Sequence, residues 1–212
     1  MVALAAGATG RGSDALPYAR GDAYLVRLSV EFDLPEELKA ARYRYKKVYC
    51  RAELTADEWN KTLTVNLTGT FLTVKYAIPL LKERGGAVII TASVNGTRIF
   101  SNAGASAYSS SKAGQVAFTK MAALELAKHK IRVNVICPGA IETAIDDSTE
   151  RRDIEAAKEP VEFPEGSIPL TDGAPGKAEQ VADLVLFLAS DAASHISGTE
   201  IWIDGAESLL QG

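Results

Sequence analysis

Apolar runs of strand length alternate with long segments of helical periodicity through most of this chain of 212 residues. A capping box, Thr-Ala-Asp-Glu at 55–58, opens a predicted helix whose apolar residues recur at helical spacing as far as Leu81. Further strands and helices are predicted at 88–92, 107–128, 131–137, 178–190 and 200–204. Because this alternation requires crossover connections, the sequence predicts an α/β fold, a doubly wound parallel sheet with helices on both faces.

The ends of the predicted strands mark the expected site, because ligands bind beyond the carboxyl ends of the strands in such sheets. Ser93 follows one strand, and Pro138 and Gly139 close the next. A shorter apolar run at 2–6 leads into a glycine-rich turn. We therefore expect these strand ends and the start of the helix at 107–128 to converge on one crevice.

The overall charge limits the classes of partner. A net charge of −4 argues against a surface built mainly to grip phosphate backbones, so we expect small metabolites as partners and no nucleic acid. Residues 39–51 interleave three tyrosines with six basic residues, a pattern typical of stacking patches for single-stranded nucleic acid. The same pattern forms a solvated helix face with the tyrosines packed inward, and the acidic balance of the whole chain favours that interpretation.

The cysteines and the apolar runs indicate a cellular compartment. Cys137 ends an apolar run and is predicted to be a buried free thiol, and with Cys50 it could form at most one bridge, which indicates a reducing compartment. No apolar run approaches the ~20 residues that span a bilayer, and the opening segment has no basic leader, so we expect a cytoplasmic protein without membrane attachment. His129 and His195 are isolated in the sequence, so no metal centre is expected.

Tyr108 and Lys112 lie four positions apart in the predicted helix at 107–128. Residues at this spacing share one helix face, so the ammonium would stabilise phenolate over phenol. The pKa of Tyr108, ordinarily near ~10, would fall, and the residue would exchange protons near neutral pH. The alternative for this pair taken alone is a helix with an outward Lys and a half-buried Tyr.

Several segments together resemble the classical short-chain dehydrogenases/reductases. VNLTGTF at 65–71 is similar to the helix that carries that family's active-site Asn, and IITASVNG at 89–96 is similar to its strand-end Ser. YSSSK at 108–112 matches its Tyr-x-x-x-Lys, and RVNVICPGAIET at 132–143 resembles its Asn-x-x-x-Pro-Gly segment. The resemblance extends from about residue 54 to 206 and implies one Rossmann-like, three-layer α/β/α domain over 1–212.

The resemblance implies an NAD(P)-dependent oxidoreductase that transfers a hydride between a nicotinamide and a secondary alcohol or ketone. Tyr108 would be the general acid/base, Lys112 would lower its pKa and hold the nicotinamide ribose, and Ser93 would hydrogen-bond the substrate oxygen. Asn66 is a poor helix former, so we expect a local bulge that exposes its carbonyl to a water near Lys112. The other implied cofactor-binding residues are Gly7, Gly10, Gly12, Pro138, Gly139, Ile141 and Thr143.

The first fifty residues depart from the family's pattern. The glycine turn is one residue short in its first gap and has Ala6 in place of Thr. By resemblance, residues 1–53 would be a shortened dinucleotide-binding part, too short before Asn66 for all the units that the family places there. The choice between NAD and NADP therefore stays open. Three interpretations remain: an active enzyme with an abbreviated adenine half, a scaffold that has lost cofactor binding, or a polypeptide with loops absent from this sequence.

The remaining 54–212 would be the catalytic part. Within it the polar stretch at about 144–177 would be the substrate lid, and a long irregular connection of this kind is predicted to be mobile. The resemblance also implies a homodimer or homotetramer packed through the two long helices. The small residues Ala113, Gly114 and Ala117 would permit close helix contact there.

Overall fold

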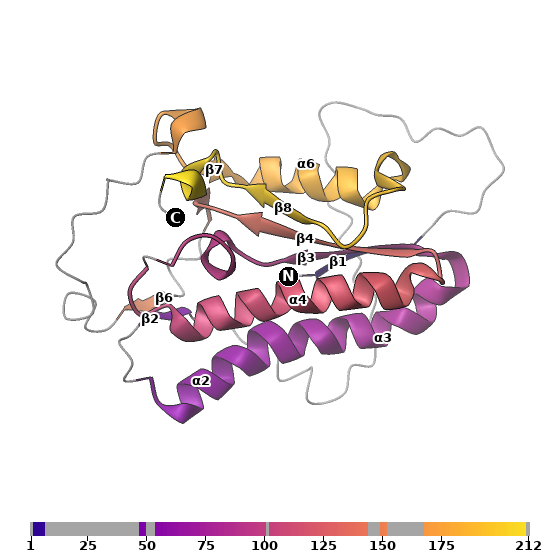
Figure 1. The fold of residues 1–212 in the computed structure, drawn as a ribbon, viewed down its shortest axis with the longest axis horizontal. Helices are drawn as coiled ribbons and strands as arrows, with labels where there is room; N and C mark the ends of the chain where they lie inside the picture. Colours follow the sequence, from indigo (N-terminus) through magenta and orange to yellow (C-terminus); the bar gives the residue numbers. More distant parts are fainter. Residues whose placement is uncertain are drawn as a thin grey trace.

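The computed structural model describes residues 2–6, 47–49, 54–100, 102–143, 149–151 and 168–210. A sheet in the order β1-β3-β4-β8 lies between helices α3 and α4 on one face and α6 on the other (Figure 1). Its strands are β1 (Val2–Ala6), β3 (Gly86–Thr91), β4 (Ile131–Pro138) and β8 (Glu200–Ile203). The predicted three-layer α/β/α arrangement is confirmed.

The first long helical segment is interrupted by a single π-turn. It consists of α2 (Ala56–Leu63), the π-helix η1 (Thr64–Thr68) and α3 (Gly69–Arg84). The predicted capping box starts it, since Thr55 and Glu58 each accept a hydrogen bond from the other's backbone N–H. Gly85 ends α3 at φ 74°, and a Cβ there would lie 2.7 Å from the Lys130 carbonyl oxygen, so glycine is required. The other helices are α4 (Ser106–Ala127) and α6 (Ala178–Ala189).

The three strands β3, β4 and β8 run parallel, and both faces of the first two are buried. Along β3, Val88 and Ile90 pack with the core beneath α3 and α4, while Ala87 and Ile89 pack with the core beneath α6. Alternate side chains point to opposite faces of a strand, which explains why the four residues at 87–90 are all apolar.

Strand β1 runs antiparallel to β3, with Val2 opposite Ile90 and Ala6 opposite Gly86. The prediction that this strand ends at the same crevice as Ser93 is therefore wrong. Ala6 lies beside the first residue of β3, roughly 15–20 Å along the strand from its carboxyl end. An apolar run buries equally well in either direction, and an antiparallel edge strand on a parallel sheet is common, so the pattern does not encode direction.

Several predictions of local structure lie outside the described residues. These are the glycine turn with Gly7, Gly10 and Gly12 and most of the predicted lid. Within the predicted lid, β6 (Thr149–Arg151) pairs in parallel with β2 (Lys47–Tyr49), which belongs to the basic run at 39–51. The sequence analysis did not predict this pairing.

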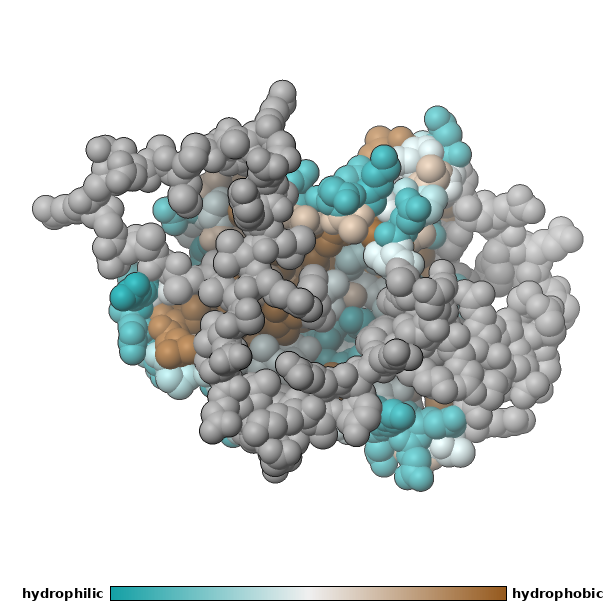
Figure 2. All heavy atoms as spheres, turned by 180° about the vertical axis from the view of Figure 1, so that it is seen from behind, coloured by the Kyte–Doolittle hydropathy of each residue, from teal (hydrophilic) through white to brown (hydrophobic). Residues whose placement is uncertain are grey.

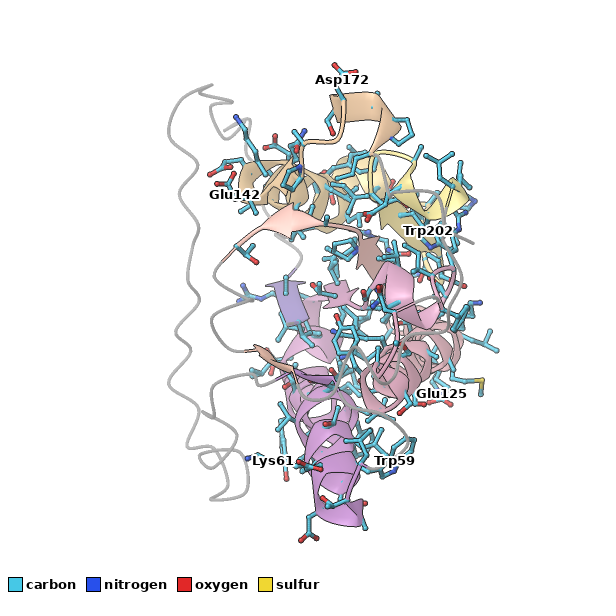
Figure 3. All side chains as sticks on the ribbon, turned by 90° about the vertical axis from the view of Figure 1, so that its left-hand side faces the viewer. Trp59, Lys61, Glu125, Glu142, Asp172 and Trp202 are labelled. Carbon is cyan, nitrogen blue, oxygen red and sulfur yellow. The ribbon has the colours of Figure 1, made fainter. Side chains whose placement is uncertain are left out.

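A second pair of short strands lies near the two ends of the predicted lid. β5 (Ile141–Glu142) pairs in parallel with β7 (Gly176–Lys177). In the side view of Figure 3, Trp59 and Lys61 of α2 lie at one end of the molecule, Asp172 lies at the other, and Trp202 of β8 lies between them. In the described part of the chain, no helix combines the length and apolar character that crossing a membrane requires.

Candidate active site

Tyr108 and Lys112 lie in the first two turns of α4 and are buried together, with 6% and 5% of their surfaces exposed. The Lys112 Nζ lies 5.6 Å from the centroid of the Tyr108 ring. It also donates a 2.9 Å hydrogen bond to the carbonyl oxygen of Thr91, the last residue of β3. The ammonium is therefore directed toward the carboxyl end of the strand, and the alternative of an outward Lys is wrong.

Ser93 lies just beyond β3, in a loop that packs directly on α4. Its Oγ accepts a 3.2 Å hydrogen bond from the Asn95 N–H and caps the short helix η2 (Val94–Gly96). A Cβ on Gly96 would lie 2.6 Å from the Ala113 nitrogen and 2.8 Å from the Lys112 Cβ. Glycine at 96 therefore lets the serine loop rest on the turn of α4 that carries Lys112.

Asn66 lies within the π-helix η1 and is buried, so the predicted bulge is confirmed. Its Nδ2 donates a 3.0 Å hydrogen bond to the Ser111 Oγ, and Ser111 donates in turn to the Tyr108 carbonyl at 2.7 Å. Its backbone carbonyl accepts from Gln115 Nε2 at 2.8 Å and from Thr70 Oγ1 at 2.7 Å. A carbonyl oxygen has two lone pairs, so a water near Lys112 could reach it only by displacing one of these donors.

Cys137, near the end of β4, confirms the prediction of a buried free thiol. Burial, and secondarily the charge of Glu200, raises its pKa to about 11, against smaller opposing effects that include a hydrogen bond to Thr97. The Ser93 backbone is another hydrogen-bonding partner. The end of β4 therefore lies beside the serine loop, as the convergence of strand ends predicts.

The segment from Pro138 onward follows β4 at the same edge of the sheet. Gly139 is packed so closely that a Cβ would lie 2.7 Å from the Asp204 Cβ, and the Ala140 N–H donates a 3.0 Å bond to Glu207 Oε2. The Ile141 side chain packs on Gly176, since its Cδ1 would be 2.8 Å from a Cβ there. Residues beyond it are exposed: Glu142 (Figure 3) and Thr143.

The structure thus places the predicted residues in two groups. Asn66, Ser93, Tyr108 and Lys112 are brought together by η1, η2 and α4, and Pro138, Gly139, Ile141 and Thr143 follow the neighbouring strand. Gly7, Gly10 and Gly12 lie outside the described residues. The strand before them, β1, ends beside the amino end of β3, away from Ser93.

Two polar residues of the site were missed by the sequence analysis, Ser111 and Gln115. Both are buried on the face of α4 that carries Lys112, with 0% and 1% of their surfaces exposed. The sequence does contain a signal for Gln115. This polar side chain lies three positions after Lys112, on a helix face that also carries Val116 and must be buried.

The histidines stand apart from this cluster. His129 follows the C-terminal end of α4 and is half-buried, and His195 is exposed. Across the described ranges, no three His, Cys, Asp or Glu residues are grouped so that they could hold a metal ion.

The fold and site define a class of protein: a doubly wound α/β domain with a buried Tyr-Lys pair at the carboxyl edge of parallel strands. A family model described as Enoyl-(Acyl carrier protein) reductase matches residues 44–206. The chain therefore belongs to the short-chain dehydrogenase/reductase family.

Individual relatives agree with this assignment. The chain is 37% identical over 152 residues to trans-4-hydroxycyclohexanecarboxylate dehydrogenase of Sinomonas cyclohexanicum, covering 72% of this chain and 52% of the relative. It is 39% identical over 150 residues to a 3-oxoacyl-(acyl-carrier-protein) reductase of Thermotoga maritima, covering 70% and 56%. The chain thus spans about half the length of the curated relatives that it matches.

Solved structures give the same picture. A 3-ketoacyl-ACP reductase from Sinorhizobium meliloti superimposes with a TM-score of 0.71 at 48% identity, over 77% of this chain and 65% of that one. A 3-ketoacyl-(acyl-carrier-protein) reductase from Brucella melitensis, complexed with NADH, gives a TM-score of 0.65 at 27% identity, over 78% and 64%.

Proposed function

We propose that the protein is an NAD(P)-dependent oxidoreductase that transfers a hydride between a nicotinamide cofactor and a secondary alcohol or ketone. The observation that carries this proposal is the burial of Tyr108 and Lys112 side by side, at the strand end that also presents Ser93. The names of the relatives support it, since they include dehydrogenases and oxoacyl reductases, and one solved relative holds NADH.

The residues at the carboxyl edge fit the nicotinamide end of such a cofactor. Lys112 offers N–H donors suited to ribose hydroxyls, and the exposed segment after Pro138 offers backbone and hydroxyl groups suited to a carboxamide. When bound, the nicotinamide would supply the hydride acceptor or donor. Either NAD or NADP is consistent with these residues, because the groups that would distinguish the two cofactors bind the adenine half.

Three side chains would handle the proton and the charge of the reaction. Tyr108 gives or takes the hydroxyl proton, and the nearby Lys112 ammonium stabilises the phenolate that this exchange produces. The Ser93 Oγ accepts a bond from the Asn95 N–H, so its own hydrogen can be donated to a substrate oxygen where negative charge develops.

Replacement of Tyr108 by Phe tests this assignment. We expect Tyr108→Phe to reduce turnover of alcohol or ketone substrates by at least ~10²-fold, because the proton donor is lost, while nucleotide affinity stays nearly unchanged. Steady-state kinetics and nucleotide titration measure the two quantities. Tyr76→Phe, at an exposed tyrosine of α3, is the matched control. Turnover at the wild-type rate in Tyr108→Phe rules out the mechanism.

A second candidate function is a scaffold of the same family that does not bind nucleotide. The antiparallel direction of β1 favours it, because Ala6, the last residue of this strand, lies beside the first residue of β3 and away from Ser93. Nucleotides that fail to raise the melting temperature of the folded protein support this candidate, and any clear rise excludes it.

We also propose that the protein assembles as a homodimer or homotetramer through α3 and α4. These helices leave large apolar side chains exposed. Seen from behind, the molecule also shows hydrophobic (brown) residues among hydrophilic (teal) ones (Figure 2). Ala113 and Ala117 are exposed on α4, whereas Gly114 serves contact within the chain, since a Cβ there would lie 2.9 Å from Leu67 Cδ2. The apolar side chains exposed on α3 and α4 are those of Phe71, Leu80, Met121 and Leu124. A monomeric mass by light scattering contradicts the assembly.

A further inference from the structure

Gln115 is the most deeply buried amide side chain near the proposed catalytic group, with 1% of its surface exposed. Its Nε2 donates to two acceptors at once, the Asn66 carbonyl at 2.8 Å and the Thr70 Oγ1 at 2.8 Å. Its Oε1 accepts no hydrogen bond from the described residues. Burying an acceptor without a donor lowers the free energy of unfolding. The two hydrogen bonds that this amide donates must offset that loss.

The two bonds act at the interruption between α2 and α3. Asn66 is bound by α4 at both of its polar ends, by Ser111 at the side-chain amide and by Gln115 at the backbone carbonyl. Ser111 and Gln115 are four residues apart on α4 and therefore lie on one face, with Lys112 between them in sequence. The π-helix is in this way bound to the turn of α4 that carries Lys112 and to the turn that follows it.

We propose that Gln115 is a positioning residue of this site: by holding the Asn66 carbonyl, it fixes the π-helix against α4 and keeps Lys112 beside Tyr108. The effect of Gln115 on catalysis rests on the proposed function. Its effect on the position of Lys112 beside Tyr108 does not require bound nucleotide. Thr70 completes the arrangement, because its hydroxyl donates to the same carbonyl and accepts from Gln115.

A substitution that removes the amide without changing the volume much separates this role from packing. Gln115→Leu takes both donated bonds away from Asn66 and Thr70. The matched control is Thr119→Val, one turn further along α4, where an equally buried hydroxyl bonds only the Gln115 carbonyl within the helix. Both changes remove buried hydrogen bonds, but only the first touches the π-helix.

The first readout is the ionisation of Tyr108 in the protein without nucleotide. Tyrosinate absorbance is titrated in each background and corrected by the matching Tyr108→Phe variant, so that the difference reports Tyr108 alone. We expect Gln115→Leu to move the midpoint to higher pH, because Lys112 is no longer held beside the phenol, and Thr119→Val to leave it in place. Equal midpoints in Gln115→Leu and wild type overturn the proposal.

The second readout is the split between kcat and KM. We expect Gln115→Leu to lower kcat about tenfold or more at nearly constant KM for nucleotide, since small misplacements of catalytic groups cost rate rather than binding. Thr119→Val keeps the wild-type kcat. If both variants lose rate equally, the role is structural and the proposal fails. A wild-type protein without turnover overturns the proposed function, whereas the Tyr108 titration still decides the role of Gln115.

Gln115→Glu keeps the test decisive if the Leu variant does not fold. A protonated carboxyl can donate one hydrogen to the Asn66 carbonyl, but an ionised one cannot. We expect the Glu variant to hold kcat closer to wild type at low pH and to lose this advantage as the buried carboxyl ionises. Activity that follows the wild-type pH profile throughout contradicts the proposal.

Discussion

Cys137 is buried beside the proposed catalytic loop, and its protonation is coupled to folding. Burial, and then the charge of Glu200, raises the pKa of its thiol from the ordinary value of 9.0 to about 11 in the folded protein. The folded state therefore binds this proton more tightly than the unfolded chain does. The corresponding stability is present below about pH 9 and is lost as the pH rises toward about 11.

Urea unfolding across this alkaline window measures the effect. We expect the free energy of unfolding of the wild type to fall by up to ~2–3 kcal/mol between about pH 8.5 and 11 through this group alone. Cys137→Ala loses stability at every pH through its cavity but lacks this component of the pH dependence. Parallel curves for the two proteins contradict the assigned thiol pKa.

Residues with a distinctive spacing were predicted from the sequence, and residues defined by packing were not. Tyr108 and Lys112 are four positions apart, and Ser93 ends an apolar strand, so their spacing and the family resemblance predicted that they converge at the strand ends. Their burial is seen in the structure. The role of Gln115 depends on which helix face meets the π-helix across a separation of 49 residues. No local pattern encodes that contact.

The loop after β3 and helix α4 pack with almost no space between them at Gly96. A Cβ at this position would meet backbone atoms of α4, so Gly96→Ala must push η2 away from the turn that carries Lys112. We expect this variant to lose about 1–3 kcal/mol of stability, measured by urea unfolding.

Gly69→Ala is the matched control for that substitution. Its Cβ would lie 3.6 Å from the Thr64 carbonyl oxygen, an ordinary contact, and alanine favours helix over glycine by up to ~1 kcal/mol. We expect Gly69→Ala to be neutral or stabilising. An equally stable Gly96→Ala protein indicates that the serine loop does not rest on α4 as described.

Most elements were predicted to within two residues because their periodicity is strong. The predicted helix at 107–128 is α4 (Ser106–Ala127), and the predicted strand at 131–137 is β4 (Ile131–Pro138). The direction of β1 was predicted wrongly, since an apolar run specifies burial but not orientation. The β2–β6 pairing was missed because it joins two short segments about a hundred residues apart.

At the scale of the whole molecule, the family match covers residues 44–206 and leaves residues 1–43 unmatched. The described elements from β2 to β8 all lie inside the matched range. Before β2, the only described element is β1, whose carboxyl end lies away from Tyr108 and Lys112. Nucleotide binding is therefore the property on which the enzyme and scaffold proposals differ most.

Thermal melting of the intact protein, with and without millimolar NAD, NADH, NADP and NADPH, tests the central proposal most directly. A ligand that binds only the folded state adds ~2.7 kcal/mol of stability at a concentration one hundred times its Kd. We predict a rise in melting temperature with one oxidised and reduced pair, retained in Tyr108→Phe, which would also identify the preferred cofactor. A cooperative transition that none of the four nucleotides shifts contradicts the oxidoreductase proposal and supports the scaffold.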